Sequence, residues 1–282
     1  MPKKSYKIEL TQKQTLLGMP SDKDWALIAN YADKSLIKNK ITYTLGEMLH
    51  LPYSPKSKFI ELYINSNYLG IYQLTETIKT GVNRVNISKK LPSFLVEIDM
   101  KYKDNEIVVF SNSGKAFRIH SPKEASSSAL DTLKNHLKFI EECLETNCYK
   151  QTNSLDSIFA LNEYIAYYWI QEFTKNIDGA FRTSVYFSLE KGHPISMGPL
   201  WDFDIAYGGQ KDVKGTGYWY MRDSYWNKNL FKDDNFKDLI NTFWQNNHTT
   251  FENLLDTVNT YKESLTPAAK NNFKRWPILQ ST

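Results

Sequence analysis

The sequence predicts an α+β protein in which strands dominate the first part of the chain and helices dominate the rest. Up to about residue 100, apolar side chains mostly alternate with polar ones or form short runs, whereas beyond residue 122 they mostly recur at helical spacing. Hydrophobic residues make up 41% of the 282 residues and aromatic residues 14%, which is enough apolar surface for a substantial core. A β-rich part followed by a helical part is typical of an α+β fold with two lobes.

The first part is predicted to contain five strands and one helix. Alternation, β-rich composition or a short apolar run predicts strands at 4–10, 58–64, 68–75, 94–98 and 106–110. Asn65-Ser66-Asn67 between the second and third of these runs predicts a hairpin. Apolar residues at helical spacing predict a helix over 33–49, with Asp33 as its N-cap and Pro52 soon after its end.

The second part is predicted to be helical, with one hairpin inserted into it. Apolar residues at helical spacing predict helices at 126–144, 154–173 and 234–260. Serines at the start of the first helix are suitable N-caps. Two β-rich runs, 183–189 and 195–201, flank Glu190-Lys191-Gly192-His193-Pro194 and predict the hairpin.

The charge distribution makes nucleic acid an unexpected partner. The formal net charge is +4, from 35 basic and 31 acidic residues spread along the chain, and the longest basic block is Lys3-Lys4. No run of eighteen apolar residues occurs, so no membrane-spanning helix is expected. The first residues contain no apolar signal region, and we expect no secretion signal in this chain.

The cysteines and histidines do not predict a zinc site. Cys143 and Cys148 lie five residues apart in a helical segment, and we expect two unpaired thiols. The five histidines are scattered singly along the chain, away from further ligands at short spacing.

Three aspartates at the ends of the second predicted hairpin are the strongest candidates for chemistry. Asp178 precedes the hairpin, and Asp202 and Asp204 follow it, so all three carboxylates are expected to gather at one end. Clustered carboxylates serve either to hold Mg²⁺ beside substrate phosphates or to perform paired acid and base work on a glycoside. The alternative is a local role, in which the carboxylates cap turns and accept backbone N–H groups.

A wider set of short motifs resembles the CotH family over nearly the whole chain. The matching pieces, in family order, are Lys3-Lys4-Ser5-Tyr6-Lys7-Ile8-Glu9-Leu10, Leu16-Leu17-Gly18-Met19-Pro20, Asp24-Trp25, Ala29-Asn30-Tyr31-Ala32-Asp33-Lys34-Ser35-Leu36, Glu61-Leu62-Tyr63-Ile64-Asn65, Gly70-Ile71-Tyr72, Leu74-Thr75-Glu76, Arg84-Val85-Asn86-Ile87, Phe173-Thr174-Lys175-Asn176-Ile177-Asp178 and Gly198-Pro199-Leu200-Trp201-Asp202-Phe203-Asp204. CotH proteins resemble protein kinases in fold, and characterised members transfer phosphate from ATP to Ser-rich proteins. By this resemblance, we expect the chain to lack the family's Arg-Gly-Asn-Ser-Thr-Trp-like stretch before the first strand and its last helical stretch.

The resemblance implies a role for each candidate residue in phosphoryl transfer. Asp178 would be the catalytic aspartate that accepts the proton of the substrate hydroxyl, and Asp202 and Asp204 would hold Mg²⁺. Lys4 would bind the ATP phosphates, with Lys3 and Lys7 as rivals. Glu61 and Glu76 would belong to the same nucleotide site. Either Glu47 or Glu61 would pair with the lysine, and an exposed helix position is the alternative for Glu47. Thr183 and Ser184 stand where kinases place a metal-binding asparagine.

The resemblance also implies a domain organisation, a partner and a location. We expect a two-lobed, protein-kinase-like fold with a β-rich lobe over 1–100 and a mainly helical lobe over 101–282. The expected partner is a Ser-rich protein, and the family suggests the spore coat or the outside of a bacterial cell. The alternative is a non-catalytic coat or adhesion protein on a truncated kinase-like fold, and carbohydrate hydrolysis is a third reading.

An aromatic cluster follows the last carboxylate motif. It comprises Tyr218-Trp219-Tyr220 and Tyr225-Trp226. Exposed rings of this kind stack on sugars or peptides, but packing over the protein's own core is the favoured prediction.

Overall fold

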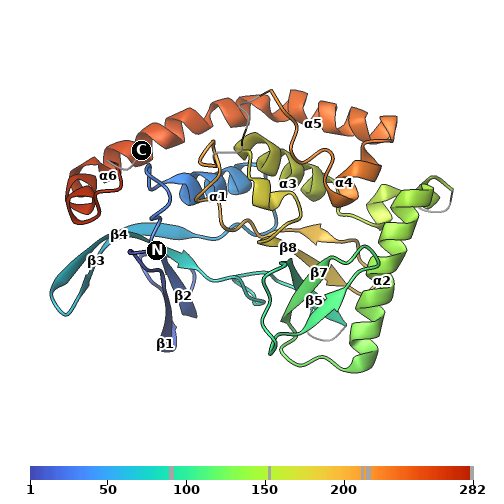
Figure 1. Ribbon diagram of the computed structural model, residues 1–282, viewed down its shortest axis with the longest axis horizontal. Coiled ribbons are helices and arrows are strands. Elements are labelled where there is room, and N and C mark those ends of the chain that lie inside the picture. Colours follow the sequence, from blue (N-terminus) through green and yellow to red (C-terminus); the bar gives the residue numbers. More distant parts are fainter. Residues whose placement is uncertain (89–91, 152–153, 211–212, 214–216, 280–282) are drawn as a thin grey trace.

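The computed structural model is a mixed α+β fold with two antiparallel sheets and several helices, which confirms the α+β part of the predicted fold class (Figure 1). It describes residues 1–88, 92–151, 154–210, 213 and 217–279.

The first sheet is four-stranded and contains the predicted hairpin. Its strands are β1 (Tyr6–Gln14), β2 (Asp22–Ile28), β3 (Ser57–Ile64) and β4 (Asn67–Glu76), in the order β1-β2-β4-β3. Ile64 pairs with Asn67 across a two-residue turn in which Asn65 and Ser66 have φ angles of 47° and 64°. Positive φ at both central positions matches the right-handed twist of a hairpin, which explains why Asn-rich turns favour this connection.

The second sheet joins strands that are far apart in the sequence. Its strands are β5 (Ser93–Ile98), β6 (Val108–Phe110), β7 (Ala116–Ser121), β8 (Val185–Glu190) and β9 (Ser196–Met197), in the order β6-β7-β5-β8-β9. The hairpin predicted to follow Asp178 is therefore present as β8 and β9. Every residue of β5 is buried, and β5 pairs with both β7 and β8. The strand predicted at 94–98 thus lies in the same sheet as the β8–β9 hairpin, and the division at residue 100 stays a prediction.

Most helices lie along one side of the two sheets, and the helix that follows β7 runs beside the second sheet (Figure 1). The helices are α1 (Lys38–Met48), α2 (Ser127–Thr146), α3 (Leu161–Thr174), α4 (Tyr225–Leu230), α5 (Asp234–Glu252) and α6 (Leu254–Arg275), with short 3₁₀ turns at Cys148–Lys150, Leu155–Ser157 and Ile177–Gly179. Ser126 caps α2 as predicted, because its Oγ accepts the Ala129 N–H at 3.2 Å. Asp33 is not the N-cap of α1, so that prediction is wrong. Leu36 adopts a φ of 68°, which delays the helix until Lys38, whose N–H then donates to the Asp33 carboxylate at 2.8 Å.

One large apolar core connects both parts of the chain. It includes Ile71 from the first sheet, Phe94 from the second, and Leu133, Phe203 and Leu265 from the second part of the chain. A smaller cluster around Trp25 and Tyr72 belongs to the first sheet alone. Within the described residues, no helix is both long and apolar enough to cross a membrane.

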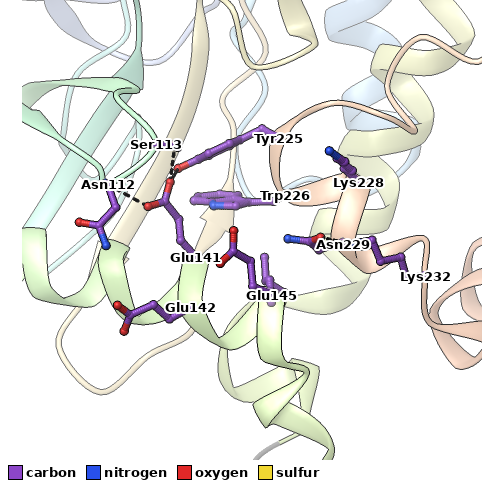
Figure 2. Close-up of a pocket in the computed structure, with 11 residues that line it drawn as sticks. Asn112, Ser113, Glu141, Glu142, Glu145, Tyr225, Trp226, Lys228, Asn229 and Lys232 are labelled. Atoms are coloured by element: carbon purple, nitrogen blue, oxygen red, sulfur yellow. Dashed lines mark hydrogen bonds between the residues drawn. The ribbon is translucent and has the colours of Figure 1, made fainter.

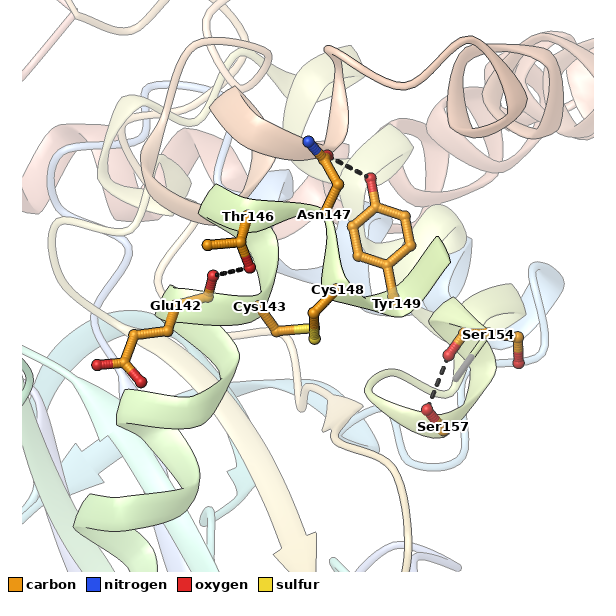
Figure 3. The surroundings of a disulfide bond; sticks show 8 residues. All are labelled: Glu142, Cys143, Thr146, Asn147, Cys148, Tyr149, Ser154 and Ser157. Carbon is orange, nitrogen blue, oxygen red and sulfur yellow. Dashed lines mark hydrogen bonds between the residues drawn. A yellow bond between two sulfur atoms is a disulfide. The ribbon is translucent and has the colours of Figure 1, made fainter. Parts of the chain in front are cut away.

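The two cysteines form a disulfide, so the prediction of two unpaired thiols is wrong (Figure 3). Helix α2 ends at Thr146, and Asn147 takes the left-handed conformation with a φ of 56°. This residue reverses the chain and brings the Cα of Cys148 to 4.8 Å from the Cα of Cys143, within bonding range for a disulfide.

Candidate functional site

Asp178 lies on a tight turn between α3 and β8. Its carbonyl oxygen accepts the backbone N–H groups of Arg182 at 3.0 Å and Thr183 at 3.3 Å. A Cβ at Gly179 would overlap the side-chain amide of Gln171, so glycine is required for this close approach. The turn holds Asp178 in a defined position at the start of the hairpin.

Asp202 and Asp204 lie on the segment that follows β9. Asp202 adopts a φ of 65°, which is unusual for a residue other than glycine and points to a constrained turn. The Phe203 N–H donates to Asn39 Oδ1 at 2.7 Å, and the Lys38 ammonium donates to the Asp204 carbonyl at 3.3 Å. The start of α1 therefore holds this segment in place.

The charge of Asp178 acts on Asp202 and the charge of Asp202 acts on Asp204, so the structure brings the three carboxylates into one neighbourhood. Desolvation by the surrounding protein atoms raises the pKa of Asp202, and the charges of Asp178 and Glu97 raise it further. The hydrogen bond from the Ser184 hydroxyl, at 3.2 Å, opposes this rise. Burial raises the pKa of Asp204 to about 6, again with help from the Asp202 charge. A bound cation would relieve this repulsion.

A cavity of about 290 Å³ lies between the first sheet and the Asp202–Asp204 segment. Its lining includes Lys3, residues at the end of β2, Asn39, Trp201 and the two aspartates. The cavity is therefore lined by residues of both predicted lobes, with Lys3 from the first lobe and Asp202 and Asp204 from the second.

Lys3 lines this cavity, whereas Lys4 does not. The Lys3 side chain is 3% exposed, and its ammonium donates to the carbonyl oxygens of Ala29 and Ile71 and to Asn272 Oδ1. Burial lowers the pKa of Lys3 to about 8. Lys4 is exposed, and its contact with the first sheet is a backbone one, in which its carbonyl accepts the Tyr72 hydroxyl at 3.0 Å.

The predicted glutamates lie away from the cavity lining. Glu61 is exposed on β3 and accepts the Tyr68 hydroxyl at 2.9 Å. Glu76 is fully buried and pairs with Arg84 at 2.5 Å. Glu47 pairs with Lys56 at 3.0 Å. Each of these carboxylates therefore has a partner other than Lys3 or Lys4.

The aromatic cluster divides into a buried and an exposed part. Trp226 is 2% exposed and packs against Phe181, in agreement with the core-packing prediction. Tyr218 and Trp219 are 59% and 52% exposed. Packing over the core therefore describes one end of the cluster only.

The donor set at the cavity fits a hard divalent cation with few protein ligands. Among the described residues, no group of three His, Cys, Asp or Glu side chains is arranged to hold a metal ion. Mg²⁺ commonly takes only one or two carboxylates, because waters and substrate phosphates complete its shell. Asp202 and Asp204 supply such a pair.

Two residues of this site carry no signal in the sequence. Lys38 and Asn39 are ordinary polar residues at the start of a helix, and their contacts with the Asp202–Asp204 segment span more than 160 positions. A contact between positions so far apart in the sequence cannot be predicted from a local motif.

Comparison with protein-family models matches residues 1–282 to the family described as CotH kinase protein. A search of curated proteins finds no match to the chain.

Proposed function

The chain belongs to the CotH family, and from that premise we propose that it is a kinase that transfers the γ-phosphate of ATP to Ser or Thr of a protein substrate, with Mg²⁺. In this proposal the first sheet covers the nucleotide, and the second sheet and the helices carry the carboxylates, as in the two lobes of a protein kinase. A Ser-rich protein of a spore coat or cell surface is the proposed partner.

The cavity that contains Lys3, Asp202 and Asp204 is the observation that carries this proposal. Phosphoryl transfer needs a cation on the phosphates, carboxylates for the metal and an oriented hydroxyl, and it needs little covalent chemistry from the protein. The cavity combines a buried cation with two crowded carboxylates, and Asp178 lies close enough to raise the pKa of Asp202. The observed set of groups therefore matches the needs of the reaction.

Each side chain has a role that follows from its surroundings. Asp178 would accept the proton of the substrate hydroxyl, and Asp202 and Asp204 would hold Mg²⁺. When bound, Mg²⁺ neutralises charge on the phosphates. Lys3 would contact a phosphate oxygen in exchange for one of its present acceptors, which makes it a stronger candidate than Lys4.

Calorimetric titration of ATP with Mg²⁺ tests the nucleotide site. We expect Asp202→Asn and Lys3→Met to weaken binding by about tenfold or more, or roughly 1.4 kcal/mol, because each removes a charged contact. Lys4→Met is the matched control for Lys3→Met, and Asp256→Asn, on exposed α6, is the control for Asp202→Asn. Equal loss in Lys3→Met and Lys4→Met would contradict the assignment of Lys3.

Transfer of labelled phosphate to a serine-rich peptide tests the catalytic step. We expect Asp178→Asn to bind Mg²⁺ and ATP normally but to transfer phosphate at least about 100-fold more slowly, as for loss of a general base. Unchanged transfer in this variant would exclude Asp178 as the base.

The hydrogen bonds of Lys3 favour a second candidate, a non-catalytic coat or adhesion protein on the same fold. All three ammonium donors have protein acceptors, so Lys3 also acts as a structural tie between β4 and the end of α6. This candidate predicts no heat of Mg²⁺–ATP binding in the native chain.

A further inference from the structure

A second cavity, of about 570 Å³, lies between the end of α2 and α4. Figure 2 shows glutamates of α2 on one side of it and Lys228 and Lys232 on the other. The two walls thus carry opposite charges, with three carboxylates on the α2 side: Glu141, Glu142 and Glu145.

The three carboxylates differ in the number of hydrogen bonds and ion pairs that they make within the protein. Glu141 accepts the Tyr225 hydroxyl and the Ser113 hydroxyl, each at 2.6 Å, so it is fixed in place. Glu142 has an exposed ion pair with Lys138 at 3.5 Å. The carboxylate of Glu145, in the last turn of α2, has no hydrogen bond or ion pair within the part of the chain that the structure describes. Its carboxylate is free to bind a ligand that carries positive charge.

A buried donor independently points to a ligand at this cavity. Trp226 lines the cavity and is 2% exposed, and its indole N–H has no acceptor among the described residues. Figure 2 shows the indole nitrogen on the ring edge that faces Glu141 and Glu145. Because buried polar groups in folded proteins are nearly always paired, this N–H calls for an acceptor from a ligand.

From these contacts we infer that the cavity binds an extended peptide segment with a lysine or arginine side chain. The basic side chain meets the carboxylates of Glu145 and Glu142. Backbone carbonyl oxygens of the peptide accept from the Trp226 indole and from Lys228 on the opposite wall. A peptide is the ligand class that offers a cation and several neutral acceptors at once.

The cavity is joined to the catalytic turn through aromatic packing. The ring centroids of Phe181 and Trp226 lie 5.4 Å apart, and Phe181 comes three residues after Asp178. The inference that the bound segment belongs to the phosphorylated protein rests on the proposed function.

Peptide binding measured by fluorescence anisotropy, without nucleotide, tests this site. The probe is a labelled peptide of glycine and serine with two lysines, and the matched peptide has norleucine in place of each lysine. We expect the lysine peptide to bind the native chain about tenfold more tightly than the norleucine peptide, because it makes charged hydrogen bonds. Glu145→Gln should remove most of this difference, and Glu263→Gln, on the exposed surface of α6, should preserve it.

Equal binding of the two peptides, or an unchanged preference in Glu145→Gln, would overturn the inference. Since Glu145 is exposed, this variant is expected to fold, and a circular dichroism spectrum equal to that of the native chain is the check. The Asp178→Asn variant should bind the lysine peptide as tightly as the native chain does. Failure of phosphate transfer therefore leaves the peptide site intact, and failure of peptide binding leaves the kinase proposal intact.

Discussion

The buried ion pair between Arg84 and Glu76 allows a sharp test of how the first sheet is stabilised. Both side chains are fully buried, and the Arg84 guanidinium donates to Glu76 at 2.5 Å. Glu76 also accepts the Tyr53 hydroxyl at 3.0 Å and the Lys56 backbone N–H at 2.9 Å. Burial raises the pKa of Glu76, while the Lys56 N–H, the Arg84 charge and the Tyr53 hydroxyl oppose the rise.

The perturbation is Arg84→Met, which keeps much of the side-chain volume and removes the charge. Breaking one partner of a buried pair costs about 3–5 kcal/mol, because the remaining carboxylate is left without its counter-charge. That loss would lower the urea midpoint by about 1 M or more. Protonation of Glu76 limits the cost at low pH.

Urea unfolding at pH 7 and at pH 5 measures both effects. Without Arg84 the pKa of Glu76 in the folded state rises further above its unfolded value. A carboxyl group with a raised folded pKa contributes stability at low pH and loses it as the pH rises through that pKa. We therefore expect the deficit of Arg84→Met to be smaller at pH 5 than at pH 7.

Arg182→Met, at an exposed position, is the control and should change stability by no more than about 0.5 kcal/mol. An equal deficit in both variants, or a deficit for Arg84→Met that does not vary with pH, would refute the reasoning. Normal ATP affinity in a folded Glu76→Gln variant would further assign Glu76 to stability rather than to nucleotide binding.

Three further predictions concern the close contact at Gly179, the disulfide and the Asp204 carboxyl group. Gly179→Ala should destabilise the protein by about 1–3 kcal/mol in urea unfolding, because the added methyl group overlaps Gln171. Reduction of the Cys143–Cys148 disulfide should cost about 2 kcal/mol, the chain-entropy value for so short a loop, and should lower the melting temperature. Because the pKa of Asp204 is about 6, protonation should weaken Mg²⁺-dependent ATP binding progressively below that pH in calorimetric titrations.

Each of these three predictions has its own control variant. A Cβ at Gly81 meets no atom within 4 Å, so Gly81→Ala should leave stability nearly unchanged. A Cys143→Ala, Cys148→Ala double variant should be insensitive to reductant. An Asp204→Asn variant should bind Mg²⁺ and ATP weakly and without the acid-dependent step; a step that persists in it would belong to another group.

Much of the local structure could be predicted from short segments of the sequence. The Asn65-Ser66 turn, the Ser126 cap and the helical spacing of α2 depend on residues a few positions apart, and the structure contains all three. The disulfide could not be predicted in this way, because it depends on the left-handed conformation of Asn147. Strands β2 and β7 had no strand prediction.

The candidate site also contains features that could be predicted from the sequence and features that could not. The motif around Asp202 and Asp204, and the position of Asp178 before the hairpin, are visible in the sequence because a hairpin returns the chain to its start. Whether Lys3 or Lys4 lines the cavity with these aspartates is not visible in the sequence, since the two lysines are adjacent and differ only in which side of the extended chain they lie on.

The sequence by itself determined the α+β class, the two hairpins, most helices and the carboxylate motif, because periodicity, turn conformation and capping act over a few residues. Only the tertiary structure decided that Lys3 lines the cavity with Asp202 and Asp204, that β5 pairs with β8, and that Asn272 and Lys3 share a hydrogen bond. These contacts join distant segments, and burial of a common core, rather than any local preference, brings such segments together.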